Sequence, residues 1–191
     1  MYIWAWQAPE FPPLLVDWEI LSSSVLYFER DAGVPRPAAR ISARALATVE
    51  THDLVPLAGF AEGRDLRIRR AVGQLADDAA LDAALAERAG EYDAWLARLR
   101  EEGCLDAACE PDAPALAGAF HCFLSRTPAP LVGVSLDDLA GETEPVNVPG
   151  VPVAQHRSWS RRMRVPLESI PETPAAKSTA AALANRARRH Q

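Results

Sequence analysis

Three short β-prone runs, each followed at once by polar or charged residues and separated by helix-forming segments, constrain this sequence most strongly. The runs are Leu46–Val49, followed by Thr51, His52 and Asp53; Val25–Phe28, preceded by a Ser22–Ser24 loop and followed by Glu29–Asp31; and Leu131–Leu136, followed by Asp137 and Asp138. Polar side chains at the carboxyl ends of buried strands are typical of α/β barrels. The pattern therefore predicts parallel βα units.

Helix-forming sequence fills most of the chain between the Leu46–Val49 run and the Leu131–Leu136 run. Residues 68–89 and 91–102 are rich in Ala, Leu, Glu and Arg, and Gly90 and Gly103 are expected to separate helices. Tyr92, Trp95, Leu96 and Leu99 recur at steps of three and four residues, which predicts one core-facing stripe. A second apolar helical face runs from Ala115 to Leu124.

The expected organisation has one main domain with distinct ends. Residues 1–19 form an irregular lead-in, because Pro9, Pro12 and Pro13 forbid a regular helix through its middle. Residues 20–172 form the α/β part, with a helical segment at about 61–127, and residues 173–191 form an Ala-rich tail that is helical or disordered. A closed eight-stranded barrel needs about 250 residues. The expected fold is therefore α/β, an incomplete (β/α)8 TIM barrel containing about its sixth to eighth strands.

Charge and composition exclude several classes of partner. The net charge is −6, whereas a nucleic acid or an anionic membrane requires a basic face. No apolar stretch approaches the roughly 20 residues that span a bilayer. An odd cysteine count, Cys104, Cys109 and Cys122, favours reduced thiols in the cytoplasm, and their spacing to His121 matches no ordinary zinc site. We therefore expect no nucleic acid, membrane, metal or cofactor.

Asp53 and His52 are the strongest functional candidates, because they stand where the strand ends and the chain turns at Pro56. The alternative is that Thr51 or Asp53 merely caps the following helix, since both residue types are common N-caps. The residues alone leave both interpretations open. Further along, the Val148–Gly150 corner is a rigid turn at which backbone can approach a ligand closely.

Several segments in a fixed order resemble one enzyme family over about Leu21–Ile170. They are LSSSVLYFERD (21–31), ALATVETHDL (45–54) with LAG (57–59) and EGRD (62–65), FHCFLSRTP (120–128), LVGVSLDDL (131–139) and GETEPVNVPG (141–150). Together they resemble the carboxyl-terminal portion of bacterial 4-α-glucanotransferases, the amylomaltases or disproportionating enzymes of glycoside hydrolase family seventy-seven.

This resemblance implies a retaining barrel enzyme that transfers segments of an α-1,4-glucan to the 4-hydroxyl of another glucan, with maltodextrins as partners. Retention requires a nucleophilic carboxylate and an acid/base carboxyl about 5 Å apart. The family's Thr-His-Asp motif corresponds to Thr51, His52 and Asp53, so Asp53 would be a third, transition-state-stabilising carboxylate and His52 would contact the same sugar. Thr51 would belong to the substrate site, and Asn147 would lie at the mouth of the glucan cleft.

The sequence also departs from the family. The nucleophile and the acid/base lie on earlier strands, and the segment carrying the acid/base should fall near Tyr2, where neither residue is present. Residues 1–18 do not follow the family, and Val151 and Ser158–Trp159 replace residues usual after the Pro-Gly corner. We therefore expect no transferase activity from this chain alone and, as a further partner, the missing amino-terminal half of the barrel. The alternatives are a non-catalytic glucan-binding or interaction fragment, and an unrelated α/β domain.

Overall fold

A computed structural model describes residues 11–107 and 110–189. Its main sheet has three short parallel strands, β1 (Ser22–Val25), β4 (Ala45–Thr48) and β5 (Leu131–Val132). Their order in the sheet is β1-β4-β5. Ser24 lies opposite Ala47, and Ala47 lies opposite Val132. The parallel direction confirms the expected βα arrangement, and a small parallel sheet with helices is present.

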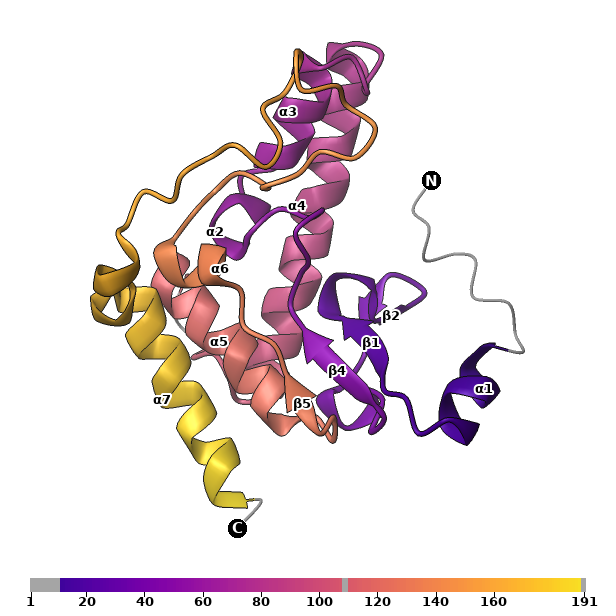
Figure 1. The fold of residues 1–191 in the computed structure, drawn as a ribbon, viewed down its shortest axis with the longest axis vertical. Coiled ribbons are helices and arrows are strands. Elements are labelled where there is room, and N and C mark those ends of the chain that lie inside the picture. The colour runs from indigo at the N-terminus through magenta and orange to yellow at the C-terminus, as the bar shows by residue number, and fades with distance from the viewer. Residues whose placement is uncertain (1–10, 108–109, 190–191) are drawn as a thin grey trace.

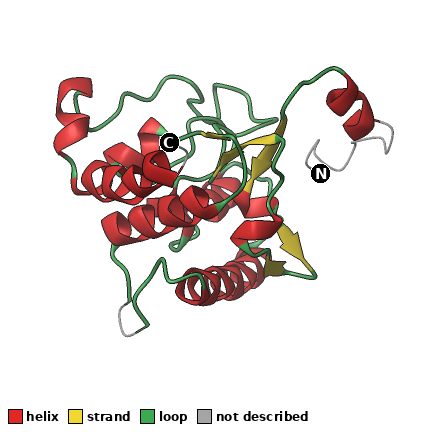
Figure 2. Cartoon of the chain, turned by 90° about the horizontal axis from the view of Figure 1, so that it is seen from below, coloured by secondary structure: helices red, strands yellow, loops and turns green. Residues whose placement is uncertain are grey.

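Helices account for most of the remaining chain (Figures 1 and 2). The α-helices are α1 (Phe11–Asp17), α2 (Leu57–Phe60), α3 (Arg64–Ala71), α4 (Asp78–Glu101), α5 (Ala113–Arg126), α6 (Leu136–Ala140) and α7 (Pro174–Arg189). The 3-10 helices are η2 (Leu26–Phe28), η3 (Ala38–Arg40) and η4 (Leu167–Glu172), and β2 (Arg30–Asp31) pairs antiparallel with β3 (Val34–Pro35).

The core lies between the sheet and the helices α4 and α5. Trp95 of α4 is fully buried, and its ring lies 5.1 Å from that of Phe120 and 5.6 Å from that of Phe123 on α5. Ala47 and Val49 contribute from the sheet side to the same cluster. The expected core stripe is thus confirmed at Trp95, Leu96 and Leu99, while Tyr92 is only partly buried against it.

Four expected element boundaries were wrong. The helix expected over residues 68–89 is interrupted, because α3 ends at Ala71 and α4 begins at Asp78. The first strand comprises Ser22–Val25, because these residues pair with β4, and Leu26–Phe28 turns away as η2. The third strand stops at Val132, because Ser135 caps α6 by accepting a hydrogen bond from the Asp137 N–H. Gly90 does not end a helix: α4 runs through it, since the apolar stripe beyond Gly90 anchors the helix to the core.

The chain ends follow the expectation in part. Residues 11–17 form α1 where an irregular lead-in was expected, and Pro174–Arg189 forms a helix that packs along α5 (Figure 1). Residues 1–10, Cys109 and residues 190–191 lie outside the described part of the chain. In the part that is described, no helix has both the length and the apolar character needed to cross a membrane.

Candidate glucan site

The segment after β4 forms a tight turn that exposes its polar side chains. The Leu54 N–H donates to the carbonyl oxygen of Thr51 at 2.9 Å, and the Asp53 N–H donates to Thr51 Oγ1 at 3.4 Å. Thr51 therefore stabilises the turn by accepting both hydrogen bonds. The side chains of His52 and Asp53 are 59% and 40% exposed. Exposed side chains of this kind are available to a ligand.

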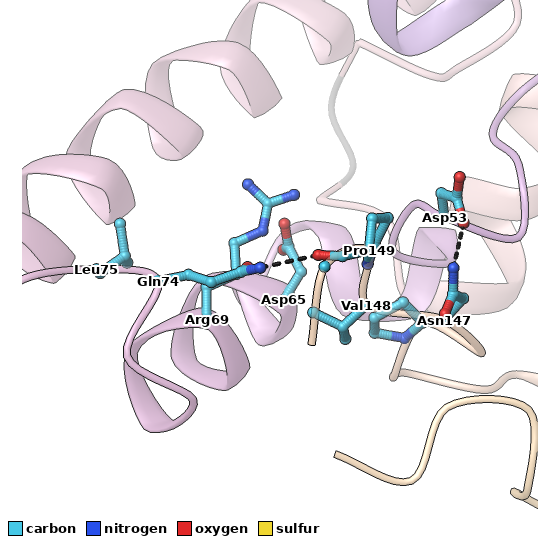
Figure 3. A pocket seen from close by; sticks show the side chains of 10 residues that line it. Asp53, Asp65, Arg69, Gln74, Leu75, Asn147, Val148 and Pro149 are labelled. Carbon is cyan, nitrogen blue, oxygen red and sulfur yellow. Dashed lines mark hydrogen bonds between the residues drawn. The ribbon is translucent and has the colours of Figure 1, made fainter. Parts of the chain in front are cut away.

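Asn147 joins this turn from the loop after α6. Its Nδ2 donates to Asp53 Oδ1 at 2.6 Å, and its backbone N–H donates to the carbonyl oxygen of His52 at 3.2 Å (Figure 3). His52 Nε2 lies 3.4 Å from the same Asp53 Oδ1. The structure thus brings together all four residues named from the sequence, Thr51, His52, Asp53 and Asn147.

The alternative that Thr51 or Asp53 caps a helix is wrong. The next helix, α2, has Pro56 at its N-cap position and no side-chain cap. Its first backbone N–H, that of Leu57, donates instead to Asp138 Oδ1 at 2.7 Å. The Asp53 carboxylate is therefore not needed for helix capping.

Asp53 and Asn147 line an open cavity of about 510 Å³. Its opposite wall comes from α3 and the turn after it, and Gln74 Nε2 donates across it to the carbonyl oxygen of Pro149 at 2.9 Å (Figure 3). The remaining lining residues are Asp65, Arg69, Leu75, Pro145, Val148 and Gly150. A cavity with carboxylate, amide and guanidinium groups around an apolar floor suits a small polar ligand.

Trp159 is a site residue that the sequence analysis did not select. Its ring centroid lies 5.1 Å from that of His52, its side chain is exposed, and its φ of 61° lies in the left-handed region. Its N–H donates to the carbonyl oxygen of Val146, which ties the conformation to the Asn147 loop. Asp65 and Arg69 of α3 and Gln74 of the turn after it were also not selected, because nothing in the sequence of a helix or a turn marks which residue faces a distant strand end.

Two buried carboxyls stand beside the turn. Burial raises the pKa of Glu50 to about 8, helped by the nearby Asp138 charge, and raises the pKa of Asp138 to about 7. The other acidic residues of this region do not join the site: Asp137 and Glu142 pair with Arg161, and Glu144 pairs with Arg64. Across the described residues, no group of three or more His, Cys, Asp or Glu side chains could hold a metal ion, and Cys104 and Cys122 are not joined in a disulfide.

The structure is thus a small parallel α/β fold with an open polar cavity beside the carboxyl end of β4. Residues 6–168 match the sequence model of the 4-alpha-glucanotransferase family, Glyco_hydro_77, and the chain belongs to that family. The match begins at residue 6, inside the 1–18 segment for which no resemblance was expected.

Curated relatives carry the same description. The 4-alpha-glucanotransferases of Mycobacterium bovis and Mycobacterium tuberculosis are each 39% identical to the chain over 155 residues, covering 78% of the chain. That of Haemophilus influenzae is 28% identical over 163 residues, covering 82% of the chain. These alignments cover only 20% of the two mycobacterial proteins and 23% of the Haemophilus protein, so the chain corresponds to a fragment of its relatives.

A solved structure agrees with the sequence comparisons. The crystal structure of amylomaltase from Corynebacterium glutamicum superposes with a TM-score of 0.84 at 29% identity. The superposition covers 92% of this chain and 27% of that one. Nearly the whole chain therefore resembles one part of a larger amylomaltase.

Proposed function

We propose that this chain forms the part of a 4-α-glucanotransferase that binds the donor glucan through Asp53 and its neighbours. The observation that carries the proposal is the Asp53–Asn147 pair at the open cavity, in a chain that belongs to the family. Both Asn147 Nδ2 and His52 Nε2 lie against Asp53 Oδ1, so Oδ2 is the oxygen offered to sugar hydroxyls.

In the proposed reaction, a nucleophilic carboxylate attacks the anomeric carbon while an acid/base carboxyl protonates the departing glycosidic oxygen, giving a glycosyl-enzyme intermediate. The acid/base, now a carboxylate, then removes the proton from the 4-hydroxyl of an acceptor glucan, which displaces the nucleophile with net retention. Asp53 holds sugar hydroxyls and favours the distorted, oxocarbenium-like ring. His52 contacts the same sugar, Thr51 holds the turn, and Asn147 orients the Asp53 carboxylate at the cleft mouth.

The proposed architecture is part of a (β/α)8 barrel. Burial along β4 alternates: Ala45 and Ala47 are buried toward the helices, whereas Leu46 is 38% exposed on the opposite face. Leu46 lies opposite Leu131, which is 53% exposed, and opposite Ser23, which is also exposed. A sheet with helices on one face and exposed leucines on the other is what a barrel wall presents when its interior is unfilled.

A second candidate is an interaction fragment that completes another polypeptide, and the uncovered leucine-bearing face favours it. β1 and β5 are the edges of the described sheet, and edge strands with free backbone groups readily pair with further strands. The partner would supply the remaining barrel strands with the nucleophile and the acid/base. This candidate and the first differ in whether the chain binds glucan by itself.

Calorimetric titration of the purified chain with maltoheptaose tests the glucan site. We expect binding by the wild type and a loss of about tenfold or more for Asp53→Asn, since a hydrogen bond to a charged group contributes about 1.5–3 kcal/mol. The matched control is Asp93→Asn, on the exposed face of α4, which should bind as the wild type does. Equal affinity in Asp53→Asn would refute the assignment.

Incubation with maltotriose tests the chemistry. A chain that supplies one of three carboxylates offers no covalent path, so we expect neither glucose nor longer maltodextrins to form. Disproportionation that survives the replacement of Asp53 would contradict the proposed role. Activity that appears only after addition of an amino-terminal family fragment would favour completion by a partner.

A further inference from the structure

The turn that carries Asp53 is held at both ends by one segment, the connection from β5 into α6. At the start of the turn, Glu50 and Ser135 line the same small cavity, and the Ser135 hydroxyl lowers the pKa of Glu50. At its end, the Leu57 N–H donates to Asp138 Oδ1 at 2.7 Å in a buried setting. The two anchors bracket Asp53 on either side along the chain.

Both anchoring carboxyls lie out of water. Glu50 is 8% exposed and Asp138 is 3% exposed. Burial raises the pKa of both, the Asp138 charge adds to the rise at Glu50, and the Asp137 charge of α6 adds to the rise at both carboxyls. Among the described residues, no Lys or Arg forms an ion pair with either carboxyl, because Arg161 is engaged with Asp137 and Glu142.

Among the other titratable groups, His52 lines the same cavity with a side chain that is 59% exposed, and two buried groups are uncharged near neutral pH. His121 of α5 lines the same space, and burial lowers the pKa of its imidazole. Tyr27 of η2 is buried, and burial together with the Asp138 and Glu50 charges raises the pKa of its phenol well above the usual value. Ionisation of both carboxyls therefore places two negative charges together without a buried positive charge between them.

A cavity of about 240 Å³ lies between the two carboxyls, lined by residues that include Glu50, His121, Ser135 and Asp138. Three buried polar atoms of lining residues have no hydrogen-bond partner within the described chain: Thr48 Oγ1, His121 Nε2 and Asp138 Oδ2. The other His121 nitrogen, Nδ1, lies 2.7 Å from the Ala117 carbonyl oxygen. A polar cavity of this size, with several unsatisfied groups, suits ordered water.

We propose that Glu50 and Asp138 are positioning residues that, with water in this cavity, hold the 51–56 turn so that Asp53 faces the glucan cavity. The proposal rests on the proposed function, because it takes Asp53 to be a glucan contact. A singly ionised pair keeps both anchors and shares hydrogen bonds with the water. When both carboxyls ionise, repulsion separates them, the turn loosens, and the Asp53–Asn147 hydrogen bond weakens.

The side-chain amide of Asn147 reports this hydrogen bond directly, without glucan. In ¹H–¹⁵N spectra recorded from pH 6 to pH 9.5, we expect the Asn147 Nδ2 signal of the wild type to titrate with a midpoint near pH 8, where Glu50 ionises. Glu50→Gln keeps a neutral side chain of the same shape, so the titration should be lost. Glu62→Gln, which changes an exposed carboxyl, is the matched control and should titrate as the wild type does.

A purely structural role would alter stability without changing this pH profile. The proposal is overturned if the wild-type Asn147 signal is constant over this range, or if it titrates identically in Glu50→Gln. Should Glu50→Gln not fold, Ser135→Ala replaces it. The Ser135 hydroxyl lowers the pKa of Glu50, so its removal should move the midpoint to higher pH.

Maltoheptaose titration at pH 7 and pH 9 separates the two proposals. If both hold, wild-type affinity falls about tenfold across this interval and Glu50→Gln affinity does not. An Asn147 signal that titrates as expected in a chain that binds no maltoheptaose supports the positioning role and refutes the proposed function. Glucan binding by a chain whose Asn147 signal does not change with pH supports the proposed function and refutes the positioning role.

Discussion

Asn147 holds the Thr51–Asp53 turn at two points, by its backbone N–H and by its side-chain amide, across a separation of 94 residues. The backbone contact fixes the distance between the two loops, whereas the side chain orients a single carboxylate oxygen. The two contacts therefore have different consequences when the side chain is changed. Replacements that keep the backbone contact isolate the role of the amide.

We predict that Asn147→Asp destabilises the chain more than Asn147→Ala does at pH 7. The introduced carboxylate would stand where Nδ2 now lies 2.6 Å from Asp53 Oδ1, and like charges at this distance repel. The alanine variant only removes one hydrogen bond, which costs about 1 kcal/mol. Urea unfolding measures both variants. The difference should shrink below about pH 4, where carboxyls protonate; a difference independent of pH would contradict this account.

Glu50 gives a second prediction, on the pH dependence of stability. Its pKa is 4.5 in the unfolded chain and about 8 in the folded one, so the folded state binds more protons between these values. Stability therefore falls as pH rises through this window and levels off above it. Glu50→Gln should remove the Glu50 part of this fall, leaving the part that comes from the raised pKa of Asp138, and should be more stable than the wild type at pH 8 by an amount on the order of a few kcal/mol. Urea unfolding at pH 5 and pH 8 provides the measurement.

At the scale of elements, the sequence located the parallel strands and the core helices because these depend on local apolar pattern. Trp95, Leu96 and Leu99 were recognisable by their helical spacing, and all three are buried. Ser22–Ser24 was not recognisable as strand, because these residues have low β-propensity and become extended only through pairing with β4. The Thr-His-Asp turn could be named from sequence, whereas the α3 wall of the cavity required the fold.

The effect of replacing a glycine by alanine depends on the space around it in the fold. Gly59 and Gly90 therefore give opposite predictions for the stability of the chain. A Cβ at Gly59 would lie 2.0 Å from the carbonyl oxygen of Thr143, so Gly59→Ala should destabilise the chain by roughly 1–3 kcal/mol. A Cβ at Gly90 would meet nothing within 4 Å, and the position is inside α4, so Gly90→Ala should stabilise it by about 1 kcal/mol. Thermal unfolding of the pair checks both signs. A destabilised Gly90→Ala would mean that α4 breaks at this point after all.

At the scale of the whole molecule, α4 and α5 pack against one face of the sheet, and α7 runs beside α5 (Figure 1). The other face presents Leu46 and Leu131 to solvent, in register with each other. Exposed leucines on a sheet with two edge strands favour association with further protein. In the proposed barrel, this face would contact further strands.

We therefore predict that the isolated chain self-associates through this face and that Leu46→Thr with Leu131→Thr reduces the association. Threonine keeps a high β-propensity, and both positions are already exposed, so the monomer should lose little stability. The matched control is Leu167→Thr, because Leu167 is 65% exposed on η4 and lies outside the sheet. Light scattering over a concentration series gives the mass of each variant.

A wild-type chain that stays monomeric at high concentration would show that the leucine face is tolerated in water, and the interaction-fragment candidate would lose its main support. A double variant that associates as strongly as the wild type would place the contact elsewhere, and the Leu167→Thr result would then show whether η4 contributes to it.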